Sequence, residues 1–135
     1  MPELNDSRRI PKVPSKINSA PIGVFDSGIG GLSVVKHLMD ILPHENIVYF
    51  GDTARVPYGT KSEEVVKRFA FEDSQFLLEK NVKVIVVACN TVSATAIHLL
   101  KKHLPVPVLG VMQPGASAAA EMVSNNKIGV IGTTT

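Results

Sequence analysis

The sequence predicts an α/β protein with a mainly parallel sheet, and three observations lead to this fold class. Short apolar runs alternate with stretches of helical period along the chain after residue 20. The run VKVIVVA at residues 82–88 is almost continuous in valine and isoleucine, as in strands that helices cover on both faces. A polar or glycine-rich turn separates most of these runs from the helical stretch that follows, which is the pattern of repeated βα units.

The length of 135 residues fits a single domain. The net positive charge comes from the beginning of the chain. From Pro21 onward ten basic residues balance ten acidic ones, so residues 1–20 supply the whole net charge of +2. A neutral body, in a chain that is 5% aromatic, argues against a nucleic-acid partner. Residues 1–20 are polar and lack a signal-peptide core, and no later segment resembles a membrane span. We therefore expect a disordered leader on a cytoplasmic protein that contacts no membrane.

The first βα unit is expected over residues 21–42. PIGVF at 21–25 predicts a strand, DSGIGG at 26–31 a tight turn, and residues 32–42 a helix. Glycines let the backbone of such a turn bend sharply and approach a ligand closely. Apolar side chains recur at helical spacing and share one face of the predicted helix: Leu32, Val35, Leu38, Met39 and Leu42.

A strand, a long loop and a long helix are expected next. NIVYF at 46–50 predicts the strand, and residues 51–61 predict a loop whose length suggests a function. Thr60 and Glu63 have the spacing of a capping box, which predicts a helix that begins there and ends near Glu79. One face of this helix is mostly apolar but includes an aspartate: Val66, Phe69, Asp73, Phe76 and Leu77.

The remaining elements repeat the pattern and suggest a duplication. After the strand at 82–88 we expect a helix over 94–104, a strand over 106–112, a helix over 114–124 and a strand over 127–132. IGVF at 22–25 recurs as IGVI at 128–131, and small polar residues follow each copy. The repeat predicts a first α/β domain over residues 21–113 and the truncated start of a second one over 114–135.

Three polar turns follow strands of the predicted sheet, where open parallel sheets bind their ligands. The turn at 26–31 is not a dinucleotide fingerprint, because Ser33 replaces its third glycine, and it lacks the lysine of a P-loop. In this turn Asp26 could equally be a helix cap or a loop carboxylate without a chemical role. In the loop at 51–59, Tyr58 could be the exposed tyrosine of an ordinary turn. The third turn, CNT at 89–91, contains the single cysteine of the chain.

Cys89 follows a buried strand and precedes a helix, and inert packing is the alternative to a chemical role. Position 95 is threonine, which excludes a Cys-x5-Arg phosphatase loop. No histidine is placed as a base or at metal-ligand spacing, so a cysteine-hydrolase dyad and a metal site are not expected. What remains is a thiol base, an assisting carboxylate and small donors for an amphoteric ligand. That set suits abstraction of a proton next to a carboxylate.

Five blocks occur in order and together resemble the glutamate racemases: GVFDSGIGGLSV, YFGDTARVPYG, VVACNTVSA, GVMQPGA and GVIGT. The similarity spans about residues 21–135 and points to the cofactor-independent aspartate/glutamate racemase superfamily. It implies two pseudo-symmetric α/β domains with the active site between them. Two cysteines then face opposite sides of the α-carbon of glutamate, without a cofactor or metal. The product, D-glutamate, is used in peptidoglycan synthesis. A homodimer is a possible assembly.

The resemblance also implies roles for individual residues. Cys89 matches one of the two catalytic cysteines, and Asp26 matches the carboxylate that assists it. The matching substrate-binding positions come from four separate segments: Asp26, Ser27, Tyr58, Gly59, Asn90, Thr91 and Thr133.

Two features of the family pattern are missing from these 135 residues. In the family a second cysteine precedes a Thr-His pair, and a final segment returns to complete the first domain; neither occurs among these residues. Racemisation needs a proton acceptor and a proton donor on opposite faces of the α-carbon. We therefore expect the 135-residue chain to be inactive alone. The alternatives are a racemase of aspartate or another diacid, and a non-catalytic ligand-binding half.

Overall fold

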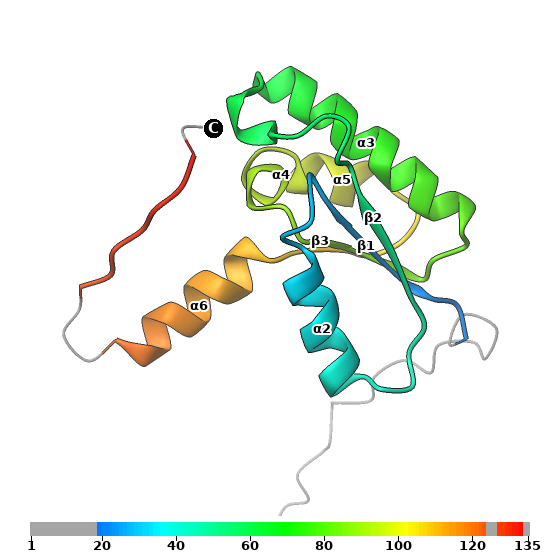
Figure 1. The fold of residues 1–135 in the computed structure, drawn as a ribbon, viewed down its shortest axis with the longest axis horizontal. Coiled ribbons are helices and arrows are strands. Elements are labelled where there is room, and N and C mark those ends of the chain that lie inside the picture. Colours follow the sequence, from blue (N-terminus) through cyan, green and yellow to red (C-terminus); the bar gives the residue numbers. More distant parts are fainter. Residues whose placement is uncertain (1–18, 124–126, 134–135) are drawn as a thin grey trace, which may run out of the picture.

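A computed structural model of the protein describes residues 19–123 and 127–133 and has the predicted α/β architecture (Figure 1). The expected leader, residues 1–20, lies outside the described residues apart from Ser19 and Ala20. Four parallel strands form one sheet in the order β2-β1-β3-β4. Their bounds are β1 Ile22–Asp26, β2 Ile47–Gly51, β3 Val84–Val87 and β4 Val108–Gly110.

Helices pack on both faces of this sheet, and one helix extends away from it (Figure 1). One face is covered by α2 Leu32–Ile41. The other face is covered by α3 Glu63–Glu79, α4 Asn90–Thr95 and α5 Ile97–His103. The short 3₁₀ helix η1 Tyr58–Thr60 precedes α3, and α6 Met112–Met122 follows β4 and projects outward.

Side chains of the central strands alternate between two apolar clusters, one on each face of the sheet. Phe25, Ile85 and Val87 belong to the larger cluster, under α3, α4 and α5. Val24 and Val86 belong to the smaller cluster, under α2. The continuous apolar run at 82–88 is thus explained, because both sets of alternate side chains are buried.

The packing of α2 differs from the prediction. Val35 and Leu38 are half-buried against the smaller cluster, together with Val34. Leu32, Met39 and Leu42 are exposed, although they belong to the predicted apolar face. The contact face is rotated toward Val34, which leaves these three side chains outside it.

The ends of the middle helices also differ from the prediction. The N-cap of α3 is Ser62, whose hydroxyl accepts a hydrogen bond from the Val65 N–H, and not Thr60, which lies in η1. The end of α3 at Glu79 is as predicted, and Asn81 beyond it adopts the left-handed conformation of a helix C-terminus. The helix predicted over 94–104 is two helices, α4 and α5, divided at Ala96.

The strand predicted over residues 127–132 is absent from the described segment 127–133, which is extended and exposed. A strand needs a neighbour for its main-chain hydrogen bonds, and no described strand pairs with this segment. It runs back from the far end of α6 toward η1 (Figure 1). The proposed domain boundary between residues 113 and 114 falls inside α6 and stays a prediction.

Candidate active site

The strand order places the candidate site at one point of the sheet edge. Starting from β1, the chain passes first to β2 on one side and later to β3 on the other. Such a reversal opens a crevice at the carboxyl ends of the two central strands, where ligands of open α/β sheets bind. Asp26 is the last residue of β1, and Cys89 follows the end of β3 by two residues. The topology therefore brings these two side chains to the same crevice.

A cavity of about 730 Å³ occupies this crevice. Its volume is within the range of small-molecule sites, roughly 300–1,000 Å³. The wall combines residues from the ends of β1 and β3, from the start of α6 and from the returning segment: Asp26, Ser27, Gly30, Ser33, Val34, Ala88, Cys89, Asn90, Thr91, Ala94, Val111, Met112 and residues 130–133.

The Asp26 carboxylate is fixed by the turn that follows it. One oxygen accepts the Ser27 N–H at 2.8 Å, and the other accepts the Gly31 N–H at 2.8 Å. The N-cap of α2 is Gly31, so Asp26 is not itself the helix cap, although the second bond ties its carboxylate to that residue. The side chain is buried but lines the cavity, and its position leaves it available to a ligand there.

The Cys89 thiol lines the cavity and is also part of the larger core cluster. Its Sγ atom lies 3.5 Å from the Ser27 Oγ atom, within the distance of a sulfur hydrogen bond. Ser27 thus touches both neighbours, because its N–H binds the Asp26 carboxylate and its hydroxyl meets the thiol. The carboxylate, the hydroxyl and the thiol form a connected polar set on one side of the cavity.

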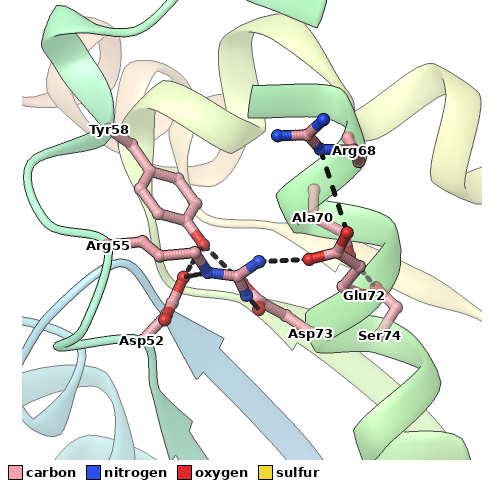
Figure 2. Close-up of polar contacts among 8 residues, drawn as sticks. All are labelled: Asp52, Arg55, Tyr58, Arg68, Ala70, Glu72, Asp73 and Ser74. Atoms are coloured by element: carbon pink, nitrogen blue, oxygen red, sulfur yellow. Dashed lines mark hydrogen bonds and ion pairs between the residues drawn. The ribbon is translucent and has the colours of Figure 1, made fainter. Parts of the chain in front are cut away.

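Tyr58 is the first residue of η1, and its side chain is almost fully buried. Its hydroxyl hydrogen-bonds to the Asp52 carboxylate and, at 2.9 Å, to Oδ2 of Asp73 on α3 (Figure 2). Burial and these two carboxylates raise the pKa of Tyr58 far above its ordinary value, so the phenol keeps its proton. The expectation of an exposed tyrosine is therefore wrong.

Arg55 completes this buried polar cluster, which we define as Asp52, Arg55, Tyr58 and Asp73. The Arg55 Nε atom lies 2.5 Å from Asp52 Oδ2, and its Nη2 atom lies 2.8 Å from Asp73 Oδ1 (Figure 2). The guanidinium also binds the exposed Glu72 carboxylate and stacks at 4.2 Å on the ring of Phe69. The loop between β2 and η1 is thereby clamped to α3.

The geometry of a thiol and a carboxylate at the sheet crevice agrees with a comparison against protein families. The family model described as Asp/Glu/Hydantoin racemase matches residues 22–135. The chain belongs to this racemase family.

The relatives and solved structures compared below are named glutamate racemases. The chain is 54% identical to the glutamate racemase of Geobacter metallireducens over 112 residues, which cover 83% of this chain and 42% of that protein. For the Oceanobacillus iheyensis enzyme the identity is 56%, with coverage of 83% and 41%. The chain thus spans about two fifths of the length of these relatives.

Two solved structures extend the similarity to the fold. The glutamate racemase from Aquifex pyrophilus matches with a TM-score of 0.82 and 52% identity, over 84% of this chain and 45% of that one. The enzyme from Francisella tularensis, solved in complex with D-glutamate, matches with a TM-score of 0.71 and 51% identity, over 75% of this chain and 39% of that one. The fold is therefore that of the first part of a two-domain racemase.

Six of the eight residues that the sequence singled out in this racemase chain line the cavity: Asp26, Ser27, Cys89, Asn90, Thr91 and Thr133. The other two, Tyr58 and Gly59, lie beside it. A Cβ atom on Gly59 would stand 2.4 Å from the Thr133 side chain, so η1 directly abuts the cavity wall. The structure therefore brings all eight positions to one region of the sheet edge.

Sequence reasoning missed the part of the wall that α6 supplies and the buried polar cluster. Met112 belongs to a stretch that the sequence assigns to a strand, which hides its place in the wall. The cluster left one usable signal, the aspartate at position 73 on an otherwise apolar helix face. Among residues 19–123 and 127–133, no group of three or more His, Cys, Asp or Glu side chains is arranged to hold a metal ion. Within the same ranges, every helix is too short or too polar to cross a membrane.

Proposed function

We propose that this chain supplies one of the two proton-transfer faces of a glutamate racemase, an enzyme that interconverts L- and D-glutamate without a cofactor. The observation that supports the proposal most directly is the meeting of Asp26, Ser27 and Cys89 in one cavity at the carboxyl edge of the sheet. Its setting is a cytoplasmic enzyme that provides D-glutamate for peptidoglycan, and a homodimer is the assembly to test.

The reaction assigns a proton transfer to Cys89. The ionised thiol takes the α-proton of glutamate, and the electron pair of the broken C–H bond passes into the substrate carboxylate. Before the transfer the Ser27 hydroxyl, whose Oγ atom lies 3.5 Å from Sγ, donates a hydrogen bond to the thiolate and keeps its proton, and the fixed Asp26 carboxylate assists the transfer. An acid on the opposite face of the α-carbon then delivers a proton and inverts the centre. That acid is a second thiol from outside these 135 residues.

We assign the binding of the substrate ends to Asn90 and Thr91. Both residues line the cavity next to Cys89 and begin α4. Thr133 lines the same cavity. Their amide and hydroxyl groups suit the carboxylates and the ammonium group of a small amphoteric ligand. The names of the curated relatives favour glutamate over aspartate as this ligand.

The decisive experiment is α-proton exchange in heavy water, with glutamate and aspartate compared on the complete product of the gene. We expect exchange with glutamate, and a loss of about a hundredfold or more in Cys89→Ser, as for other removed acid–base groups. Binding of D-glutamate to the Cys89→Ser protein serves as the control for an intact site. Exchange that is unchanged in Cys89→Ser would remove the thiol from the mechanism.

The same assay tests the proposal that one thiol is insufficient. The 135-residue chain alone should bind D-glutamate weakly and should not racemise it. Turnover by the purified chain would refute this proposal, and a preference for aspartate would favour the alternative substrate.

A further inference from the structure

The buried polar cluster lies directly behind the candidate site and is connected to it in two ways. The Asp52 N–H donates to the main-chain carbonyl of Asp26 at 2.9 Å, so Asp52 joins the cluster to the end of β1. Tyr58 is followed at once by Gly59, which packs against Thr133 in the cavity wall. The η1 turn thus lies between the cluster on its inner side and the cavity on its outer side.

The hydrogen bonds of the cluster require one more proton than is present when Asp52 and Asp73 are both ionised and Tyr58 is neutral. The Tyr58 hydroxyl has a single hydrogen, yet carboxylate oxygens of both Asp52 and Asp73 lie within hydrogen-bond distance of it. If both carboxylates are ionised, only one of them can accept that hydrogen. Both contacts are satisfied when one carboxyl is protonated and donates to the phenolic oxygen.

Asp73 is the carboxyl placed to hold this proton. With a proton on Oδ2, it donates to Tyr58, Tyr58 donates to Asp52, and Asp52 also accepts from Arg55. The other oxygen of Asp73 still accepts from Arg55 at 2.8 Å. Every polar atom named here then has a partner of the correct kind, in a continuous chain of hydrogen bonds.

We propose that Asp52, Arg55 and Asp73 are positioning residues, which hold Tyr58 through this proton-sharing chain and thereby fix the Tyr58–Gly59 turn against the candidate site. In this proposal the Tyr58 hydroxyl hydrogen-bonds inside the protein, and the turn contacts a ligand through its main chain. The inference rests on the proposed function only in treating the cavity as a glutamate site.

The surroundings of Asp73 make its proton sensitive to pH near neutrality. The pKa of Asp73 is raised to about 7, mainly by burial; the charges of Asp52 and Glu72 contribute to the rise, and Tyr58 and Arg55 oppose it. The packed helix α4 contains no titratable side chain, and those of α5 are exposed: His98, Lys101, Lys102 and His103. Asp26 faces the candidate site, and Tyr49 lies on the α2 side of the sheet. We expect the turn to be held fully below this pKa and to shift as Asp73 ionises above it.

The test is a pH titration of the 135-residue chain by NMR, over about two pH units on either side of the Asp73 pKa of about 7. It follows the carboxyl carbon of Asp73 and the amide of Gly59. We expect the Gly59 signal to move with the Asp73 midpoint. In Asp73→Asn the transition should vanish and Gly59 should stay at its low-pH position, because the amide oxygen still accepts from Arg55 while its NH₂ group donates to Tyr58.

Two further variants separate positioning from a merely structural effect. Tyr58→Phe removes the shared hydroxyl, so Gly59 should lose both its low-pH position and its response to Asp73. If Tyr58→Phe fails to fold, Asp73→Asn alone decides, since it retains the hydrogen-bond geometry. Glu79→Gln on the exposed end of α3 is the matched control and should leave the Gly59 titration unchanged. The inference would be overturned if the Gly59 signal did not change at the midpoint of the Asp73 titration. It would also be overturned if the Gly59 signal of Asp73→Asn still changed at that pH.

Addition of D-glutamate to the complete product of the gene, labelled in the same way, distinguishes the two proposals. A shift of Gly59 with Asp73, together with signals that D-glutamate leaves unmoved, would sink the proposed function and preserve the positioning role. The reverse pattern, with binding but without coupling, would sink the positioning role alone. If both hold, the affinity for D-glutamate should fall as pH rises through the Asp73 pKa in the wild type and stay constant in Asp73→Asn.

Discussion

Gly31 has the least free space of the glycines in the turn that fixes Asp26. A Cβ atom at this position would stand 2.7 Å from Asp26 Cβ and 3.0 Å from Ala88 Cβ. Both neighbours belong to the ends of central strands, so the strain falls on the candidate site. Gly31→Ala should cost about 1–3 kcal/mol of stability through overpacking and should weaken D-glutamate binding by displacing the carboxylate. Urea unfolding and a D-glutamate titration measure the two effects.

Gly28→Ala is the matched control in the same turn. The nearest atom to a Cβ at Gly28 is Val56 Cγ2 at 3.7 Å, an ordinary contact, and the described glycines all have negative φ angles. Alanine should therefore be tolerated, and the stability should change by less than about 0.5 kcal/mol. Equal losses in the two variants would show that the space around Gly31 is not what limits this turn.

At the scale of single residues, the sequence predicted the chemistry at strand ends better than the chemistry in the interior. Asp26 and Cys89 directly follow apolar runs, and the end of a parallel strand defines where the next side chains lie. The direction of the Tyr58 side chain depends instead on Asp52 and on Asp73, which lies 15 residues further along the chain. No local pattern encodes that contact, so the residues of the cluster appeared as a loop and an unexplained aspartate.

At the scale of elements, Asp73 makes the packing of α3 against the β2–η1 loop depend on pH. Its pKa is raised from an ordinary 3.8 to about 7 in the folded chain, so the folded state retains a proton that the unfolded state has lost. This contribution is complete below the unfolded pKa and is lost as pH rises through the folded one. We expect the melting temperature to fall between about pH 4 and pH 7 because of this group.

The Asp73→Asn chain isolates that contribution, since asparagine has no proton to lose. The fall in melting temperature over the same pH range should be smaller in Asp73→Asn than in the wild type, as measured by calorimetry. Identical pH profiles for the two proteins would contradict a raised pKa at Asp73. Glu79→Gln again provides the exposed control, and its profile should match that of the wild type.

The elements with strong periodicity were predictable, and those set by tertiary contacts were not. The four strands and the length of α3 follow from apolar runs and from a 17-residue amphipathic stretch. The division of α4 from α5 at Ala96 has no glycine or proline to announce it. Residues 127–132 have the composition of a strand, but a strand forms only where another strand offers hydrogen bonds.

At the scale of the whole molecule, the two faces of the sheet are stabilised unequally. The cluster under α3, α4 and α5 contains most of the buried apolar residues, whereas the cluster under α2 contains four: Ile22, Val24, Val86 and Ala88. The described side chains of α2 and α6 include none that is buried. Regions with little buried apolar surface open at a lower free energy than the core.

Hydrogen exchange should reveal this asymmetry directly. We expect the amides of α6 to exchange at least about tenfold faster than those in the middle of α3, with α2 between them. Measured by mass spectrometry or NMR, comparable protection of α6 and α3 would contradict the expectation. D-glutamate should slow exchange at the start of α6, because Met112 lines the cavity.

The chain has two tyrosines and no tryptophan, and the two phenols lie on opposite faces of the sheet. Tyr49 donates to the Gly28 carbonyl at 2.8 Å, and burial and the Asp26 charge raise its pKa, as burial and two carboxylates do for Tyr58. Phenolate absorbance in alkali should therefore appear only beyond the pH at which free tyrosine ionises, as the fold opens. One tyrosine packs against each layer of helices. A single ultraviolet titration of the two phenols therefore reports whether the packing on each face of the sheet is intact.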